Sequence, residues 1–230
     1  MFRRYELKFL LTQTQKEALL QGMQAYMALD KYGRTTIRNL YFDTEDYRLI
    51  RHSIGKPAYK EKLRLRSYEK VSSKGKVFVE LKKKYKSVVY KRRLALPEKD
   101  AVAWLAGGQC PRDCQIAREI DYCMGYYGSL KPRVFLSYER EAYFAKDGSD
   151  FRVTFDENIL CRTGQLSLES EAWGTPILDE KLTLMEIKTA GGIPLWMTKL
   201  LTQQKIYKTS FSKYGTAYQK LIFKEVFEHA

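Results

Sequence analysis

The chain has 230 residues, of which 44% are hydrophobic, enough to bury a substantial core and to argue against a disordered protein. Lysine and arginine outnumber aspartate and glutamate by 41 to 27, and the formal net charge is +14. This excess favours an anionic partner such as nucleic acid, a phosphorylated small molecule or an anionic membrane surface, but charge alone does not choose among them.

The sequence contains no segment that predicts passage through a membrane. No stretch approaches the ~20 apolar residues of a membrane span, and the first twenty residues lack the apolar core of a secretory signal. We therefore expect a cytoplasmic protein, with peripheral attachment to the inner face of the membrane as an alternative. The 4 cysteines are irregularly spaced, which predicts reduced thiols rather than a zinc site.

The predicted elements follow the order of an α+β protein. Alternating apolar and polar residues predict strands at 3–11, 35–43, 59–68, 76–84, 88–96, 131–145, 150–158 and 182–188. Apolar residues at helical spacing predict helices at 14–28, 45–54, 97–107, 112–127, 193–204 and 211–228. Residues 160–181 have weak periodicity and are expected to form loops or a ragged hairpin. No convincing linker or repeat interrupts the series, so we expect a single domain over residues 1–230.

One face of nearly every predicted strand carries cations. In the segment YKEKLRLRSY, Lys60, Lys62, Arg64 and Arg66 recur at every second residue, so a strand would project all four from one face. An ordinary solvated strand face mixes the two signs of charge. The one-sided pattern continues on the later strands, at Lys82, Lys84, Lys91, Arg93, Arg140, Arg152 and Lys188.

A closed barrel accounts for this pattern. Seven or eight strands with short connections can close on themselves, which removes exposed edges. The amphipathic helices need an apolar surface to cover, and the apolar strand faces supply it, so the charged faces would point inward. Buried like charges without partners cost several kcal/mol each, and such a lumen is therefore expected to be wet and to hold a polyanion. The alternative is an ordinary sheet whose charged face is solvated.

The expected anion is phosphate rather than nucleic acid. Sheets that bind nucleic acid interleave cations with exposed aromatic rings, whereas these basic strand faces carry few rings. No Walker loop and no G-x-G-x-x-G motif is present. Lysine and arginine side chains, rather than a helix N-terminus, are therefore expected to bind the phosphates.

Nine short segments, taken together, resemble the VTC-type polyphosphate polymerase domains of the triphosphate tunnel metalloenzyme (CYTH-like) superfamily. They follow in order along nearly the whole chain: RYELKF (4–9), LYFDT (40–44), KLRLRSY (62–68), VELKKK (79–84), YKRR (90–93), SYEREAY (137–143), RVTFD (152–156), MEIK (185–188) and FSKYG (211–215). The resemblance implies a closed antiparallel eight-stranded β-barrel with a basic lumen, flanked by helices. It also implies an enzyme that transfers the γ-phosphoryl group of ATP to a growing polyphosphate chain, with Mn²⁺ or Mg²⁺.

The resemblance and the strand pattern together give the candidate site. The expected catalytic residues are Arg64, Arg66, Lys82, Arg140, Arg152 and Glu186. The expected phosphate-binding residues are Lys8, Lys62, Lys91, Lys188, Ser212 and Lys213. Glu186 looks like the divalent-metal ligand of the family. Glu6 and Glu80 either assist it or pair with neighbouring cations.

Two positions depart from the superfamily's motifs. Arg4 stands where the hydrolytic branch has the first glutamate of E-x-E-x-K, which disfavours a two-metal triphosphatase. Ser210 stands where polymerases often have the first lysine of K-x-S-K. The alternatives are a triphosphatase or cyclase-like enzyme, and a non-catalytic module that binds polyphosphate or RNA. The expected partners are ATP and inorganic phosphate or polyphosphate, and a separate membrane protein would move the product.

Overall fold

The structure is a computed structural model that describes residues 5–86 and 88–223. Arg4 and the end of the last predicted helix lie outside the described residues. The chain divides into two compact units, each described by itself. Unit 1 comprises Met1–Thr36, Tyr138–Ile159 and Leu178–Ser212, and unit 2 comprises Ile37–Ser137, Leu160–Ile177 and Lys213–Ala230.

The strands belong to a large antiparallel sheet in the order β11-β1-β10-β8-β7-β3-β4-β5-β6, to which β2 and β9 add short pairings with β7 and β8. Their bounds are β1 Tyr5–Thr12, β2 Met27–Leu29, β3 Thr35–Asp43, β4 Tyr59–Ser67, β5 Lys76–Tyr85, β6 Val88–Pro97, β7 Lys131–Ala145, β8 Arg152–Arg162, β9 Thr175–Pro176, β10 Leu182–Thr189 and β11 Lys208–Thr209. The α+β class is confirmed, with strands and helices in the predicted order.

The expectation of a closed eight-stranded barrel is wrong. The sheet has 11 strands, and within the described part of the chain no pairing joins its two end strands, β6 and β11. β11 has only two residues and offers few hydrogen bonds to a further strand. β6 carries Lys91, Arg92, Arg93 and Pro97, and charged residues and proline on an edge strand oppose further strand pairing.

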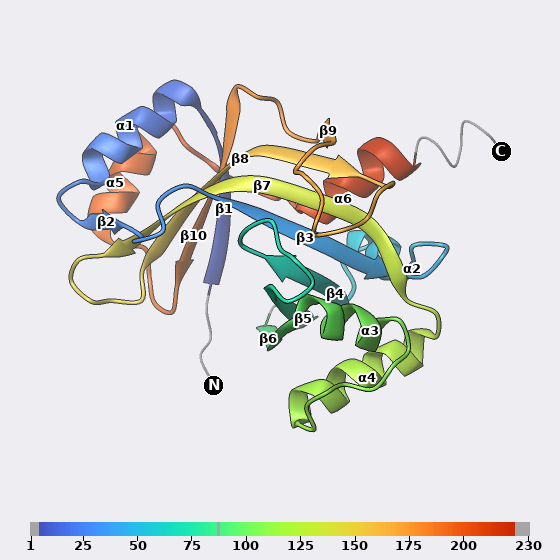
Figure 1. The fold of residues 1–230 in the computed structure, drawn as a ribbon. Helices are drawn as coiled ribbons and strands as arrows, with labels where there is room; N and C mark the ends of the chain where they lie inside the picture. The colour runs from blue at the N-terminus through green and yellow to red at the C-terminus, as the bar shows by residue number, and fades with distance from the viewer. Residues whose placement is uncertain (1–4, 87, 224–230) are drawn as a thin grey trace. The chain divides into compact units, whose positions relative to one another are not determined.

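In unit 1, helices α1 (Gln13–Met23) and α5 (Leu195–Gln203) lie side by side next to β1 (Figure 1). Thr12 ends β1 and starts α1, because its side chain accepts a hydrogen bond from the Gln15 backbone while the Gln15 side chain accepts one from the Thr12 backbone. The core between helices and strands contains Phe9, Leu11, Leu19, Met185, Ile187, Phe155, Met197 and Leu201. This core fixes which face of β1, β8 and β10 is left for polar side chains.

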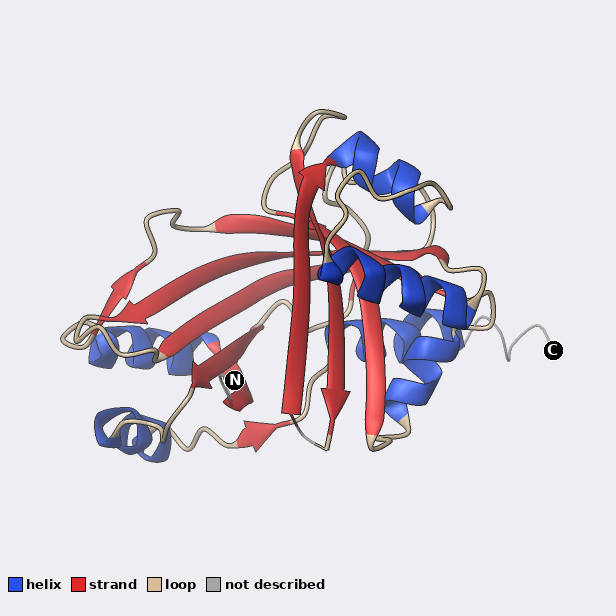
Figure 2. Ribbon diagram, turned by 90° about the horizontal axis from the view of Figure 1, so that it is seen from below, coloured by secondary structure: helices blue, strands red, loops and turns tan. Residues whose placement is uncertain are grey.

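In unit 2, α3 (Glu98–Leu105) and α4 (Gln115–Tyr127) pack beside the strand group β4 to β6 (Figures 1 and 2). α2 (Arg48–Ile54) follows β3, and α6 (Lys213–Ala217) continues into a π-helical turn, Tyr218–Ile222. The core contains Leu63, Leu65, Val79, Leu81, Leu94, Trp104, Ile120 and Phe135. The apolar residues of the alternating strands therefore face the helices, as predicted.

Some predicted boundaries differ from the structure. The helix predicted over 14–28 ends at Met23, because Met27–Leu29 pairs with β7 as a strand instead. The region 160–181, predicted as loops or a hairpin, contains the end of β8 and the short β9. Every helix in the described residues is too short or too polar to cross a membrane. The single domain over residues 1–230 stays a prediction.

Candidate functional site

The cationic side chains of unit 2 share one face of its strands. The register pairs Arg64 on β4 with Glu80 on β5. Lys82 on β5 pairs with Lys62 on one side and with Lys91 on the other. Directly opposed residues point to the same face, so these side chains stand together. The leucines and valines between them are buried in the core. The one-sided pattern of the sequence is therefore present in this unit.

Glu80 is the centre of this charged face, and its side chain is only 1% exposed. Arg64 Nη2 lies 2.6 Å and Arg66 Nη1 3.8 Å from Glu80 Oε2. Lys91 Nζ lies 2.6 Å and Arg93 Nε 3.2 Å from Glu80 Oε1. These five residues are called the Glu80 cluster. One buried carboxylate thus holds four cations from two further strands in a fixed group.

The Arg64 guanidinium is also held from a second side. Its Nε donates to Glu80 Oε2 at 2.8 Å, and its Nη1 donates to the Tyr41 hydroxyl at 3.0 Å. The Tyr41 ring stacks on Tyr214 with 4.5 Å between centroids, and the Tyr214 hydroxyl donates to Asp43 at 2.9 Å. Asp43 is fully buried and also accepts three backbone N–H groups at the turn into α2. Asp43 therefore caps the turn into α2, and Tyr41 orients Arg64.

Charge and burial shift the pKa values of Glu80 and Lys91 in opposite directions. Burial would raise the pKa of Glu80, but the positive charges of Arg64, Arg66 and Lys91 outweigh it and hold that pKa well below its usual range. Burial lowers the pKa of Lys91 to about 8, against the opposing charge of Glu80. Glu80 is therefore ionised at neutral pH, whereas Lys91 is close to titration.

The affinity for a triphosphate is expected to fall as the pH rises through the pKa of about 8 of Lys91, because the side chain loses its positive charge above that value. Loss of one charge-assisted hydrogen bond of about 1.5 kcal/mol corresponds to roughly a tenfold weaker Kd. Calorimetric titration with tripolyphosphate in buffers of different ionisation enthalpy also measures the protons taken up on binding. The Lys91→Arg variant keeps its charge and is expected to lose this pH dependence; an unchanged profile in that variant would exclude Lys91 as the titrating group.

The charged face of unit 1 has the same construction. Lys8 on β1 pairs with Glu186 on β10, and Glu6 pairs with Lys188. Lys188 in turn pairs with Arg152 on β8. The apolar residues that alternate with them lie in the core beside α1 and α5. Each of the two cations therefore faces a carboxylate between β1 and β10, whereas Lys188 and Arg152 are neighbouring cations on β10 and β8.

Glu186 is the centre of the face in unit 1, with a side chain that is 7% exposed. Its carboxylate accepts a hydrogen bond from Lys188 Nζ at 3.0 Å and lies 3.3 Å from Lys8 Nζ and 3.6 Å from Arg140 Nη2. Arg140 donates two further hydrogen bonds, of 2.5 and 2.6 Å, to the fully buried Asp156. Burial would lower the pKa of Arg140, but the charge of Asp156 raises it well above the usual value. These five residues are called the Glu186 cluster.

Glu6 and Glu186 are the carboxylates available to a divalent metal in unit 1. They flank one ammonium, because Lys8 Nζ lies 3.4 Å from Glu6 and 3.3 Å from Glu186. Mg²⁺ commonly uses one or two protein carboxylates together with substrate phosphates, and Mn²⁺ also prefers oxygen ligands. Over residues 5–86 and 88–223, no three His, Cys, Asp or Glu side chains form a group that could hold a metal. Glu6 and Glu186 are the two predicted carboxylates that a divalent metal could use if phosphate oxygens were its remaining ligands, and both are paired with Lys8 here; the four cations around Glu80 favour ion pairing there.

The remaining predicted site residues are divided between the units. Lys62 and Lys82 are half-buried on the face of unit 2. In unit 1, the Arg152 guanidinium lies over an aromatic ring, 4.3 Å from its centroid. Ser212 is an exposed residue of unit 1, and Lys213 is buried as the first residue of α6 in unit 2. The structure therefore brings Arg64, Arg66 and Lys91 to Glu80, and Lys8, Arg140 and Lys188 to Glu186.

Three residues that the geometry makes prominent are absent from the predicted site residues, although the alternation had placed Arg93 on the charged face. Asp156 holds Arg140, Tyr214 supports Tyr41, and Arg93 joins the Glu80 cluster. All three lie inside quoted segments, RVTFD, FSKYG and YKRR. Their position in those segments is the signal in the sequence that could have identified them.

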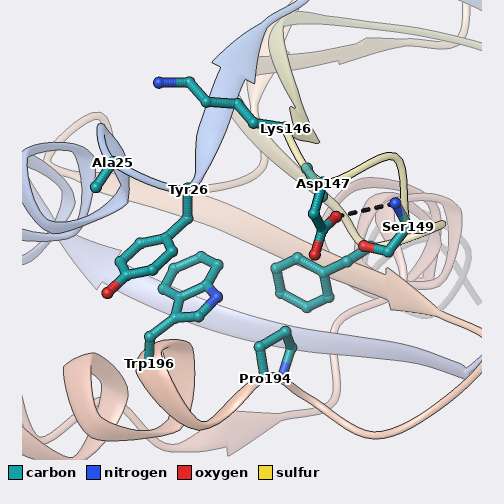
Figure 3. Close-up of a pocket in the computed structure, with 9 residues that line it drawn as sticks. Ala25, Tyr26, Lys146, Asp147, Ser149, Pro194 and Trp196 are labelled. Atoms are coloured by element: carbon teal, nitrogen blue, oxygen red, sulfur yellow. Dashed lines mark hydrogen bonds between the residues drawn. The ribbon is translucent and has the colours of Figure 1, made fainter.

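A cavity of about 280 Å³ lies elsewhere in unit 1, between the start of α5, the turn after α1 and the turn between β7 and β8. In Figure 3 the rings of Tyr26 and Trp196 lie face to face, with 4.4 Å between their centroids, and Asp147 accepts a hydrogen bond from the Ser149 backbone. The two rings already cover each other's faces, so no flat ligand fits between them. None of the predicted site residues lines this cavity, and the charged strand faces remain the candidate site.

The fold is also found in solved proteins with little sequence similarity. A protein described as a candidate adenylate cyclase from Bacillus halodurans has 16% identity and a TM-score of 0.57, with 92% of this chain and 96% of that chain covered. A protein from Vibrio parahaemolyticus with the same description has 11% identity and a TM-score of 0.48, with 93% and 97% covered. At such low identity, the first of these likenesses shows a shared fold and nothing about activity. No curated protein matches the sequence.

The match to a protein family extends over almost all of the chain. The VTC domain matches residues 3–222, which include every predicted site residue. This range also contains both the Glu80 cluster and the Glu186 cluster. The chain therefore belongs to the VTC domain family.

Proposed function

We propose that the protein is a polyphosphate polymerase-like phosphotransferase, which transfers the γ-phosphoryl group of ATP to a growing inorganic polyphosphate chain. The observation that carries the proposal is the Glu80 cluster, in which Arg64, Arg66 and Lys91 are held at fixed positions on the face of a sheet. Membership of the VTC domain family supports the same assignment. On this proposal, residues 1–230 act as one functional domain.

The chemistry depends on positioned positive charge. Phosphoryl transfer through a loose transition state needs in-line placement and neutralisation of the phosphate oxygens more than it needs a covalent nucleophile. Arg64 and Arg66 present planar guanidinium groups that can bind two phosphate oxygens at once, which a lysine ammonium cannot do. The acceptor, a terminal phosphate, is already anionic near neutral pH, so no general base is required.

The cations of unit 1 have a corresponding role. Lys8, Arg140, Arg152 and Lys188 neutralise phosphate oxygens, and Asp156 keeps the Arg140 guanidinium in one orientation. Glu186, with Glu6 beside Lys8, would hold Mn²⁺ or Mg²⁺ together with phosphate oxygens, and the ion would supply further charge neutralisation.

Ser212 and Lys213 would contribute further phosphate contacts. ATP and inorganic phosphate or polyphosphate are the proposed partners, and a separate membrane protein would take up the product.

Incubation of the purified protein with ATP and Mn²⁺, followed by gel electrophoresis of the products, tests the proposal. Long polyphosphate chains are the expected product, and the triple variant with Arg64, Arg66 and Glu186 replaced by alanine is expected to form none. Free phosphate alone would indicate a triphosphatase, and a cyclic nucleotide would indicate a cyclase. Tight polyphosphate binding without turnover would indicate a binding module, and full activity in the triple variant would contradict the site.

A further inference from the structure

Arg93 lies flat on an aromatic surface at the edge of the Glu80 cluster. Its guanidinium carbon is 3.6 Å from the ring centroid of Phe78 and 5.4 Å from that of Tyr68. The two rings are nearly perpendicular, with an interplanar angle of 83° and 5.6 Å between centroids. Arg93 therefore sits in a corner whose floor is Phe78 and whose wall is Tyr68.

One nitrogen of the guanidinium is hydrogen-bonded, and another lies close to a carboxylate oxygen. Arg93 Nη2 donates to the Tyr68 hydroxyl at 2.8 Å, and Arg93 Nε lies 3.2 Å from Glu80 Oε1. The Arg93 side chain is nevertheless 34% exposed, and Tyr68 is 42% exposed. Phe78 covers one side of the plane, so a ligand that stacks on Arg93 would have to lie on the opposite side.

A flat, partly exposed guanidinium next to an exposed aromatic ring can stack against a planar ligand. Nucleobases stack on aromatic rings and on arginine planes, and they need no hydrogen bond to do so. We propose that Arg93 and Tyr68 form a subsite for the base of the nucleoside triphosphate. This inference rests on the proposed function, because it assigns the base of the same substrate whose phosphates the Glu80 cluster would bind.

The position of the subsite relative to the phosphate-binding cations supports the proposal. Lys91 and Arg93 are two residues apart on β6, so their Cα atoms lie about 7 Å apart along the strand and their side chains share one face. Both side chains reach the same oxygen of Glu80. A base on Arg93 and a phosphate on Lys91 would be neighbours, joined by the ribose.

The subsite recognises ring faces and not the hydrogen-bonding edges of a base. It therefore distinguishes a nucleoside triphosphate from inorganic tripolyphosphate, but it does not select one purine from another. Larger rings stack more strongly, so purine nucleotides are expected to bind more tightly than pyrimidine nucleotides. Stacking of Arg93 on a base is separate from neutralising phosphate, for which a lysine at position 93 would suffice.

Two variants separate these roles in equilibrium binding to ATP and to tripolyphosphate. Arg93→Lys keeps the charge but removes the plane, and Tyr68→Ala removes the exposed ring. Each is expected to weaken ATP binding about tenfold and to change tripolyphosphate binding less than about twofold. Tyr122→Ala is the matched control, because this tyrosine is 73% exposed on α4 and lies outside the Glu80 cluster.

The binding of ATP and tripolyphosphate to the wild-type protein and the two variants distinguishes a base subsite from a phosphate-binding cation. An equal loss for both ligands would overturn the base subsite, because Arg93 would then act only as a phosphate-binding cation. Unchanged ATP binding in both variants would overturn it too. In these cases the proposed function stands. Wild-type protein that binds neither ligand would instead overturn the proposed function, and this inference with it.

Discussion

Replacement of Arg64 with lysine is expected to lower the rate of phosphoryl transfer by about 100-fold without unfolding the protein. In the wild-type protein the guanidinium is fixed by Glu80 on one side and by the Tyr41 hydroxyl on the other. A lysine keeps the charge but cannot make these two contacts and still offer two parallel donors to a phosphate. Loss of one positioned charge-stabilising donor commonly costs about 10²-fold or more in rate, or ~2.7 kcal/mol.

The measurement is the initial rate of polyphosphate formation from ATP, together with the thermal unfolding midpoint. Arg118→Lys is the matched control, since Arg118 has a side chain that is 69% exposed and pairs with Asp113 on the surface of unit 2. That control is expected to retain the wild-type rate. An Arg64→Lys rate within about threefold of wild type would contradict a bidentate role. A large fall in the unfolding midpoint would mean that the residue acts on stability instead.

The Glu80→Gln substitution is expected to lower the free energy of unfolding by about 3 kcal/mol. It leaves four cations around a neutral amide, and among them Arg66 has a side chain that is only 8% exposed. Complete loss of a buried partner costs about 3–5 kcal/mol. The lower end applies here, because the Arg93 and Lys91 side chains are 34% and 42% exposed and water screens them.

The dependence on pH identifies the cause of this loss. The folded-state pKa of Glu80 lies below its value in the unfolded chain, about 4.3, so the ionised carboxylate stabilises the fold above that pH. The stabilisation is lost as the pH falls below the unfolded value. Urea titrations of wild type and Glu80→Gln are therefore expected to differ at neutral pH and to converge in acid. Glu45→Gln, an exposed position in unit 2, is the control; a constant difference at all pH values would point to packing rather than charge.

The alternation of side chains was sufficient to predict most strands, but not how the sheet ends. The strand predicted at 182–188 is observed as Leu182–Thr189, and the one at 76–84 as Lys76–Tyr85. Barrel closure depends on the pairing of strands that are distant in sequence, which a local period does not contain. The two residues of β11 are too few to show any period.

The contacts within the site also depend on pairing between strands that are distant in the sequence. The two-residue period placed Arg64 and Arg66 on one face of their strand and Lys82 on the polar face of the next strand, because this depends only on the strand to which each belongs. The partners of these cations depend on the register between strands. That Glu80 would collect four cations, and that Asp156 would hold Arg140, followed only from the paired strands. The roles of the selected residues in binding and catalysis stay predictions.

The cationic strand faces are expected to bind a chain of phosphates. A crystal structure of the protein with a non-hydrolysable ATP analogue and Mn²⁺ tests it most directly. Phosphate oxygens are expected within hydrogen-bond distance of Arg64, Arg66 and Lys91. An analogue bound away from both the Glu80 and Glu186 clusters, with those cations still paired only to protein carboxylates, would contradict it.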